Sequence, residues 1–250
     1  MKIAIIGLGC VATADALALA RSHEVVMTGP VPDRVDAINQ GEYGLEDPCL
    51  ETYLASHSLD LKATLDTRAA LANADMVFIS SPLATDPDTG AVRLVELDSR
   101  IELANRLLPF TPIVVRSAVP VGYCEARRIA LKGAKIVFAP EFSRTGHMLT
   151  DVLHPKFLIV GDEYALGAAV LAVLKSAAVD NDVPSRQLAL MEAESLRNLA
   201  DASKARSLRD LDAVETARLP ACAVTGKNTS AVWRDPRMTT HSQVPSELHV

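Results

Sequence analysis

Short runs of consecutive apolar residues alternate with longer segments rich in alanine and leucine. Six runs predict β-strands, at residues 2–6, 24–28, 76–80, 112–116, 135–139 and 157–161. Most are apolar at successive positions, which is typical of strands covered on both faces. The segments between them predict helices, at residues 11–21, 34–39, 68–73, 94–108 and 125–131. This alternation predicts an α/β fold with a doubly wound, Rossmann-type parallel sheet.

The composition of the chain changes after about residue 180. Residues 180–185 predict a loop, and residues 187–216 form a strongly helical stretch that contains neither glycine nor proline. Residues 217–250 are dense in serine, threonine, proline and asparagine and carry no periodic apolar face, which is typical of a poorly ordered tail. We therefore expect a Rossmann-like domain over residues 1–180, a long helix over 187–216 and an irregular tail over 217–250.

A glycine-rich turn follows the first predicted strand directly and opens the first predicted helix. Its residues fit GxGxxA, a form of the dinucleotide-binding fingerprint: Gly7, Leu8, Gly9, Cys10, Val11 and Ala12. The first glycine permits the tight turn, the second lets the backbone approach a pyrophosphate, and the alanine lets the helix pack close to the strand. The helix N-terminus offers amide N–H groups to the phosphates. The turn predicts a dinucleotide site, and a glycine-rich turn without a ligand is the alternative.

The end of the second predicted strand departs from this fingerprint. An acidic residue normally stands there and holds the hydroxyls of the adenosine ribose, but this chain has Gly29. Loss of that acceptor costs about 1–3 kcal/mol of binding free energy, a factor of about ten to a hundred in affinity. The departure is also compatible with NADP, because Arg34 stands near the position of a 2′-phosphate. We expect NAD as the cofactor and leave NADP open.

Charge and composition exclude several classes of protein. The net charge of −6 offers no overall positive field to nucleic acid or anionic lipid, and 49% hydrophobic residues are typical of a globular chain. The apolar run 165–174 is shorter than the ~20 residues that cross a bilayer. Four scattered cysteines without a CxxC pair argue against a disulfide scaffold or a zinc ribbon: Cys10, Cys49, Cys124 and Cys222. We expect a reduced, cytoplasmic protein with no membrane, nucleic acid or metal partner.

Several further motifs follow one another between the N-terminus and about residue 202. After the opening MKIAIIGLGCVA come DRV at 33–35, INQG at 38–41, EDP at 46–48, SP at 81–82, DPDT at 86–89, RSAVPVG at 116–122 and APEFSRTG at 139–146. This set resembles the UDP-glucose/GDP-mannose dehydrogenase family. The SAVPVG and PEF segments are its most specific part, because general dinucleotide-binding domains do not share them.

The resemblance implies the oxidation of the primary alcohol of a nucleotide sugar, here a UDP-sugar, to a carboxylate, with NAD as the hydride acceptor. A cysteine thiolate of the family forms the covalent intermediate, and a lysine and an asparagine stabilise the oxyanion. By position, Glu141 matches an acid/base residue on the substrate side. The segment that lines the sugar nucleotide corresponds to Phe142, Ser143, Arg144 and Thr145. Cofactor-contacting positions correspond to Val11, Arg34, Leu83 and Ala118. The family dimerises through its central helix, which leaves a homodimer open.

This chain departs from the family at the residues that carry the chemistry. The segment 192–201 resembles the start of the central helix and places Arg197 at the catalytic lysine and Asp201 at the catalytic asparagine. An aspartate puts a negative charge where an oxyanion would form. The segment GGxCLPKD, which carries the nucleophile, has no counterpart after Asp201, and Cys222 lacks its glycines.

Three alternatives stay open. The first is a catalytically inactive module that binds a dinucleotide or a sugar nucleotide, or a truncated remnant of such an enzyme. The second is a two-electron hydroxyacid-type dehydrogenase, for which only Glu141 offers a base. At the level of single residues, Arg197 and Asp201 are spaced i,i+4 and would also fit a simple ion pair on a helix surface. His147 and His154 show no pattern of further metal ligands.

Overall fold

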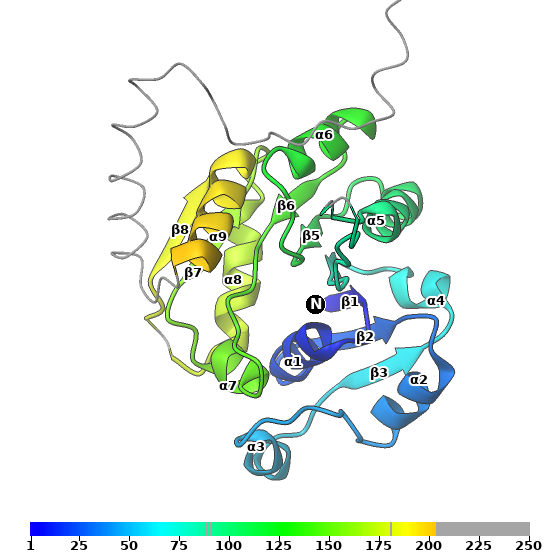
Figure 1. The fold of residues 1–250 in the computed structure, drawn as a ribbon. Coiled ribbons are helices and arrows are strands. Elements are labelled where there is room, and N and C mark those ends of the chain that lie inside the picture. Colours follow the sequence, from blue (N-terminus) through cyan, green and yellow to red (C-terminus); the bar gives the residue numbers. More distant parts are fainter. Residues whose placement is uncertain (89, 91, 181, 204–250) are drawn as a thin grey trace, which may run out of the picture.

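The computed structural model describes residues 1–88, 90, 92–180 and 182–203 (Figure 1). Within this part of the chain, strands form one sheet in the order β3-β2-β1-β4-β5-β6-β7-β8. Its strands are β1 (Lys2–Ile6), β2 (Glu24–Thr28), β3 (Leu61–Thr64), β4 (Met76–Ile79), β5 (Ile113–Val115), β6 (Ile136–Phe138), β7 (Leu158–Gly161) and β8 (Ser185–Leu188). The strand order reverses at β1, so β2 and β4 flank the first strand, as in a doubly wound sheet.

Strands β1 to β6 are parallel, which confirms the predicted Rossmann-type fold, but the sheet is not parallel throughout. Strand β7 pairs with β6 in the antiparallel direction, through Phe138 and Gly161, and β8 then runs parallel to β7. The link between β6 and β7 holds only the short helix α7 (Met148–Leu153). Because β7 starts at the edge where β6 ends, this link does not carry the chain back along the sheet, as a crossover between parallel strands would.

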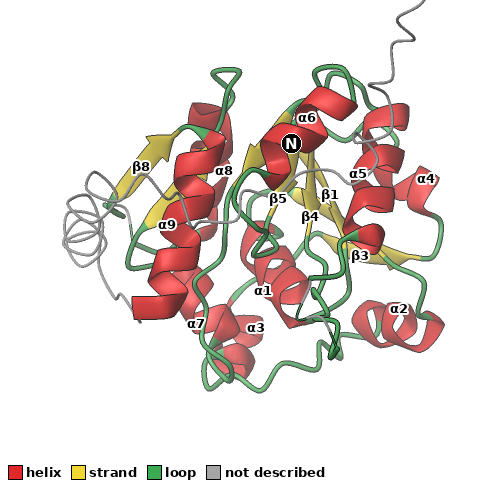
Figure 2. Ribbon diagram, turned by 45° about the horizontal axis from the view of Figure 1, so that its top comes forward, coloured by secondary structure: helices red, strands yellow, loops and turns green. Residues whose placement is uncertain are grey.

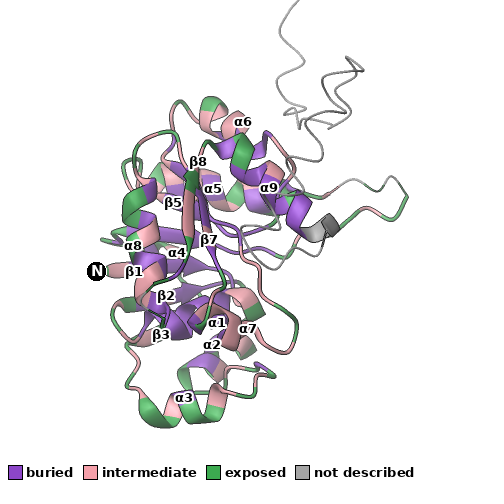
Figure 3. Cartoon of the chain, turned by 90° about the vertical axis from the view of Figure 1, so that its left-hand side faces the viewer, coloured by how far each residue is buried: buried purple, intermediate pink, exposed green. Residues whose placement is uncertain are grey.

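Helices cover both faces of the sheet (Figure 2). Alternate residues of β1 point to opposite faces: Ile3 and Ile5 pack with α1, α2, α3, α7 and α8, whereas Ala4 and Ile6 pack with α4, α5, α6 and α9. Figure 3 shows the strands buried between the two layers. The helices are α1 (Cys10–Leu19), α2 (Pro32–Asn39), α3 (Leu50–Ser56), α4 (Thr67–Leu71), α5 (Val95–Leu107), α6 (Tyr123–Ala130), α7, α8 (Gly167–Ala177) and α9 (Leu190–Ser203).

Several elements differ from the sequence-based expectation. The helix predicted from residue 187 is wrong at its start, because β8 occupies Ser185–Leu188 and α9 begins at Leu190. Polar side chains fill this edge strand, so no apolar run marks it. Elements β3, α3, α7 and α8 were not predicted. The rest of the predicted helix, 204–216, and the predicted tail, 217–250, lie outside the described residues. None of the helices in the described part of the chain is long and apolar enough to span a bilayer.

Asp47 joins the loop before α3 to the start of α7. Its carboxylate accepts hydrogen bonds from the Thr150 backbone N–H at 3.0 Å, from the Thr150 hydroxyl at 2.7 Å and from the Cys49 N–H at 3.1 Å. Partial burial by itself raises the pKa of Asp47, but these hydrogen bonds outweigh burial and lower the pKa to about 2. The ionised carboxylate therefore stabilises the folded state.

We expect Asp47→Ala to lower the free energy of unfolding by about 1–2 kcal/mol at pH 7. Because the pKa of Asp47 in the folded state lies below its ordinary value, the stabilisation is complete above about pH 5 and disappears as the pH falls towards 2. Urea denaturation of both proteins between pH 7 and pH 3 measures this difference. Glu46→Ala, at the exposed neighbouring position, is the control and should change little. A difference that does not vary with pH would contradict the assignment.

Candidate dinucleotide site and adjoining cleft

The loops after β1, β4, β5 and β6 lie at one edge of the sheet, because these strands are parallel. Hydrogen bonds join the loops to one another. The Ser80 N–H donates to the Ile6 carbonyl at 3.1 Å, and the Ser81 N–H donates to the Ser117 hydroxyl at 2.9 Å. That hydroxyl donates in turn to the Ser81 carbonyl at 2.8 Å. These hydrogen bonds therefore hold together the loops at the edge that carries the fingerprint turn.

Gly7 makes the closest backbone approach in the fingerprint turn. Its φ is +146°, and a Cβ built there would lie 2.2 Å from the Ser80 carbonyl oxygen. The same Cβ would lie 3.3 Å from the Cβ of Ala12, which is fully buried. Both the turn and the close packing of α1 thus require small residues at these two positions, as the fingerprint predicts.

Gly9 caps the N-terminus of α1 and leaves it open. Its backbone is extended, with φ −80° and ψ 175°, and no side chain caps the helix. A Cβ built at Gly9 would meet nothing within 4 Å. No side chain therefore occupies the capping position, and the amide N–H groups of the first turn, at the positive end of the helix dipole, favour an anion. This geometry suits a pyrophosphate.

The other predicted cofactor residues lie around the same edge. Cys10 is exposed and Val11 is half-buried, both in the first turn of α1. Leu83 follows β4 and packs partly against the core, and Ala118 follows β5 and is exposed. Arg34 lies in α2, near Leu8 of the turn. These residues come from four separate loops and helices, and the fold gathers them at the carboxyl edge.

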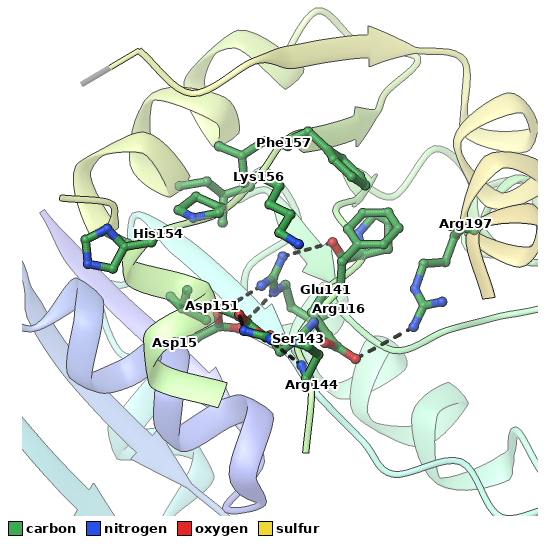
Figure 4. A pocket seen from close by; sticks show the side chains of 18 of the residues that line it. Asp15, Arg116, Glu141, Ser143, Arg144, Asp151, His154, Lys156, Phe157 and Arg197 are labelled. Carbon is green, nitrogen blue, oxygen red and sulfur yellow. Dashed lines mark hydrogen bonds and ion pairs between the residues drawn. The ribbon is translucent and has the colours of Figure 1, made fainter. Parts of the chain in front are cut away.

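A separate cleft of about 440 Å³ gathers the predicted substrate residues (Figure 4). It opens between the loop after β6, α7, α8 and α9, and it contains neither the fingerprint turn nor Thr145, which is exposed. Its lining is Asp15, Leu19, Arg116, Pro140, Glu141, Phe142, Ser143, Arg144, Asp151, Val152, His154, Pro155, Lys156, Phe157, Leu158, Leu174, Ala177, Arg197 and Ala200. The structure therefore brings Glu141, Phe142, Ser143 and Arg144 together with Arg197.

Glu141 and Arg197 face each other in this cleft. A guanidinium nitrogen of Arg197 lies 3.8 Å from a carboxylate oxygen of Glu141, and the Arg197 Cζ lies 5.2 Å from the centroid of the Phe142 ring. The second Glu141 oxygen accepts the Ser143 N–H at 2.6 Å. Arg197 is only 7% exposed, so it does not belong to a surface ion pair. Asp201 lies one turn further along α9, and its side chain is outside the described residues.

An ion pair that the sequence analysis missed closes the side of the cleft next to α1. Arg116 donates to both oxygens of Asp15, at 2.8 and 2.9 Å, and to the Ala139 carbonyl at 2.7 Å. The Arg116 and Asp15 side chains are 6% and 4% exposed. The signal was present, because a carboxylate in an otherwise apolar helix and an arginine at the end of a buried strand each require a partner. The pair fixes α1 against β5 and β6.

Charged side chains before, within and after α7 also line the cleft. The Arg144 side chain donates hydrogen bonds to both oxygens of Asp151, and its Nε lies 2.9 Å from Oδ2. Burial alone would raise the pKa of Asp151, but the hydrogen bonds and charge of Arg144 lower it below its ordinary value. His154 and Lys156, which the sequence analysis did not assign to a site, belong to the cleft lining, and Figure 4 shows Lys156 extending toward Glu141. Within the described part of the chain, no three His, Cys, Asp or Glu residues form a metal-binding group.

Glu194 determines how α9 sits against α6. It is fully buried, and its carboxylate accepts the N–H groups of Gly122 at 2.5 Å and Cys124 at 2.8 Å. Burial raises the pKa of Glu194, and these hydrogen bonds oppose that rise only in part. A residue of α9 thereby caps the N-terminus of α6. This anchor lies one turn before Arg197 and so helps to place that side chain at the cleft.

The fold and the fingerprint turn together are those of a Rossmann-type, dinucleotide-binding class of domain. Residues 1–176 match the NAD binding domain of the UDP-glucose/GDP-mannose dehydrogenase family. The chain belongs to this family, which confirms the resemblance and NAD as the family's cofactor.

Relatives with curated names agree with this assignment. UDP-glucose 6-dehydrogenase of Streptococcus pneumoniae is 29% identical over 98% of this chain and 64% of its own length. The enzyme of the same name from Rhizobium meliloti is 31% identical over 68% of this chain and 41% of its own length. The crystal structure of GDP-mannose dehydrogenase from Pseudomonas aeruginosa shares the fold, with a TM-score of 0.70 and 23% identity over 81% of this chain and 49% of that one. The chain thus spans less than two thirds of these relatives.

Proposed function

We propose that this chain binds NAD at the fingerprint turn and a nucleotide sugar, of the UDP-sugar class, in the cleft beside Glu141. We propose further that these 250 residues on their own do not complete the oxidation of the sugar alcohol to a carboxylate. The observation that carries the proposal is the open, uncapped N-terminus of α1 behind Gly9, which offers backbone N–H groups to a diphosphate.

Three features support a sugar nucleotide as the second ligand. The cleft lies beside the carboxyl end of β6, next to the edge where the dinucleotide would bind. Its walls combine the Phe142 ring with the cationic side chains of Arg144 and Lys156, which suit a base or sugar face and a diphosphate respectively. The match to the NAD binding domain of the UDP-glucose/GDP-mannose dehydrogenase family, over residues 1–176, includes the segment that forms this wall. We place Glu141 as the acid/base residue and Arg197 as its partner.

Two observations support the proposal that these residues alone do not complete the oxidation. The four-electron oxidation in this family passes through a cysteine thiolate, and this sequence has no GGxCLPKD segment. The three cysteines within the described residues do not replace that nucleophile. Cys124 is fully buried, Cys49 is half-buried and accepts a hydrogen bond from the Thr150 hydroxyl, and Cys10 lies at the fingerprint turn. In addition, Arg197 stands where the family has a lysine and already faces Glu141. An arginine keeps the charge but does not reproduce the compact ammonium.

A second candidate is an inactive module that binds both ligands without turnover. The contact between Glu141 and Arg197 favours it, because each group satisfies part of the other's charge. For both candidates we propose a cytoplasmic location, since free cysteines such as Cys49 and Cys124 are typical of a reducing compartment. A homodimer remains a proposal based on the family.

Purified chain is expected to bind NAD and UDP-glucose by calorimetry and to produce no UDP-glucuronate. Absorbance of NADH at saturating UDP-glucose, with product analysis by mass spectrometry, measures the second expectation.

Arg144→Met should weaken the binding of UDP-glucose by about tenfold, through loss of a charge-assisted hydrogen bond to phosphate, without changing the affinity for NAD. Arg93→Met, at an exposed arginine away from the cleft, is the matched control. Robust UDP-glucuronate formation would overturn the limit on chemistry, and absence of NAD binding would overturn the proposed function.

A further inference from the structure

We propose that this chain accepts NADP about as well as NAD, because no carboxylate follows β2 and Arg34 of α2 lies beside the fingerprint turn. This inference rests on the dinucleotide site proposed above. It concerns the part of that site which would face the adenosine ribose, and it names Arg34 and Gly29 as the residues that set cofactor selectivity.

The first step is the loss of the acceptor. In a Rossmann-type domain a carboxylate at the end of the second strand accepts hydrogen bonds from the ribose hydroxyls and repels a 2′-phosphate. Here Gly29 follows β2, and a Cβ built on it would lie 2.7 Å from Cγ and 2.8 Å from Cδ1 of Leu8. The Leu8 side chain therefore covers the position from which a carboxylate would project. The next carboxylate along the chain, Asp33, is exposed in the first turn of α2.

The second step is the position of Arg34. Its Nη2 donates to the Tyr43 carbonyl at 2.9 Å and makes a longer contact of 3.5 Å to the Leu8 carbonyl. Its Nη1 lies 2.8 Å from the place that a Cβ of Gly44 would occupy, so the absence of a side chain at Gly44, where φ is +62°, makes room for the guanidinium. Arg34 is thus half-buried beside the fingerprint turn, between that turn and the 43–44 loop.

The third step is the charge that remains. The Tyr43 and Leu8 partners are neutral carbonyl oxygens, so they orient the guanidinium without cancelling its charge. A planar guanidinium matches the geometry of a phosphate and binds it with two parallel hydrogen bonds. NAD loses an acceptor at Gly29, whereas NADP loses a repulsive carboxylate and gains a cation. Both changes shift the ratio of affinities towards NADP, each by about tenfold or more.

The test is calorimetry of the full chain with NAD and with NADP as separate titrants. The wild-type protein should bind the two with dissociation constants within about threefold of each other. Arg34→Met should weaken NADP by at least about tenfold and NAD by less than about threefold. Arg106→Met, at an exposed arginine in the last turn of α5, should alter neither constant. Gly29→Asp restores the carboxylate once the flexible Leu8 side chain turns away, and it should weaken NADP by about tenfold relative to NAD.

Two results would overturn the inference: NADP binding at least about tenfold weaker than NAD to the wild type, or equal losses for both cofactors in Arg34→Met. Circular dichroism of each variant keeps a folding defect separate from a binding defect. If NAD binds and NADP does not, the inference on selectivity fails and the proposed function stands. If neither binds, the dinucleotide site itself is wrong.

Discussion

Asp15→Ala is expected to lower the free energy of unfolding by about 3–5 kcal/mol, enough to unfold much of the protein if its stability is ordinary. The substitution leaves the Arg116 guanidinium, whose side chain is 6% exposed, without the carboxylate that accepts two of its hydrogen bonds. Removal of one partner leaves a buried charge unpaired, which costs more free energy than the pair contributed. Urea denaturation followed by circular dichroism measures the loss.

An exposed contact between two polar side chains provides the control for this prediction. His154 and Asp180 lie 3.2 Å apart, with side chains 52% and 56% exposed, so Asp180→Ala should change the stability by less than about 0.5 kcal/mol. The double variant Asp15→Ala/Arg116→Met tests whether the unpaired charge of Arg116 causes the loss. Removal of that charge should restore part of the lost stability. If the double variant loses as much as the two single variants together, the effect is not a property of the pair.

The central strands could be predicted because both of their faces are buried. Ile3 and Phe78, in β1 and β4, are fully buried, and their neighbours on the opposite face are buried as well, which produces runs of consecutive apolar residues. Strands β3 and β8 are the two edges of the sheet. Lys62 and Gln187 occur in them and are exposed, so no apolar run distinguishes these edge strands from loops. The antiparallel direction of β7 depends on a connection whose path no local pattern specifies.

The fingerprint turn could be predicted because its geometry is local. Six consecutive residues form the turn and the first helical turn, and each position has its own steric requirement. The pairs that support the cleft join distant segments instead: Arg116 and Asp15 are 101 positions apart, and Glu194 is 72 positions from Gly122. A single sequence indicates that such charged residues need partners when they are buried, but it does not identify the partner of each. Resemblance to the family pointed to both Glu141 and Arg197, and the fold showed that the two side chains face each other.

The two glycines of the fingerprint turn should respond differently to alanine. Gly7→Ala places a Cβ 2.2 Å from the Ser80 carbonyl oxygen at a φ of +146°, so we expect a loss of about 2–4 kcal/mol of stability together with the loss of NAD binding. Gly9→Ala meets nothing within 4 Å and keeps an ordinary extended backbone, so its stability should change by less than about 1 kcal/mol. Its methyl group nevertheless occupies the space through which a pyrophosphate approaches the α1 amides, and NAD affinity should fall by about tenfold to a hundredfold.

Thermal unfolding and NAD calorimetry of the two variants separate the roles of the glycines. Gly41→Ala is the matched control for a glycine with open space but away from the turn, and it should leave NAD binding intact while its φ of +85° costs some stability. A Gly9→Ala protein that binds NAD like the wild type would show that the diphosphate does not approach the helix at this point. A stable Gly7→Ala protein would show that the turn can move away from β4. The expected pattern, with stability lost at Gly7 and affinity lost at Gly9, follows only if the turn is fixed by the sheet while its open side receives the ligand.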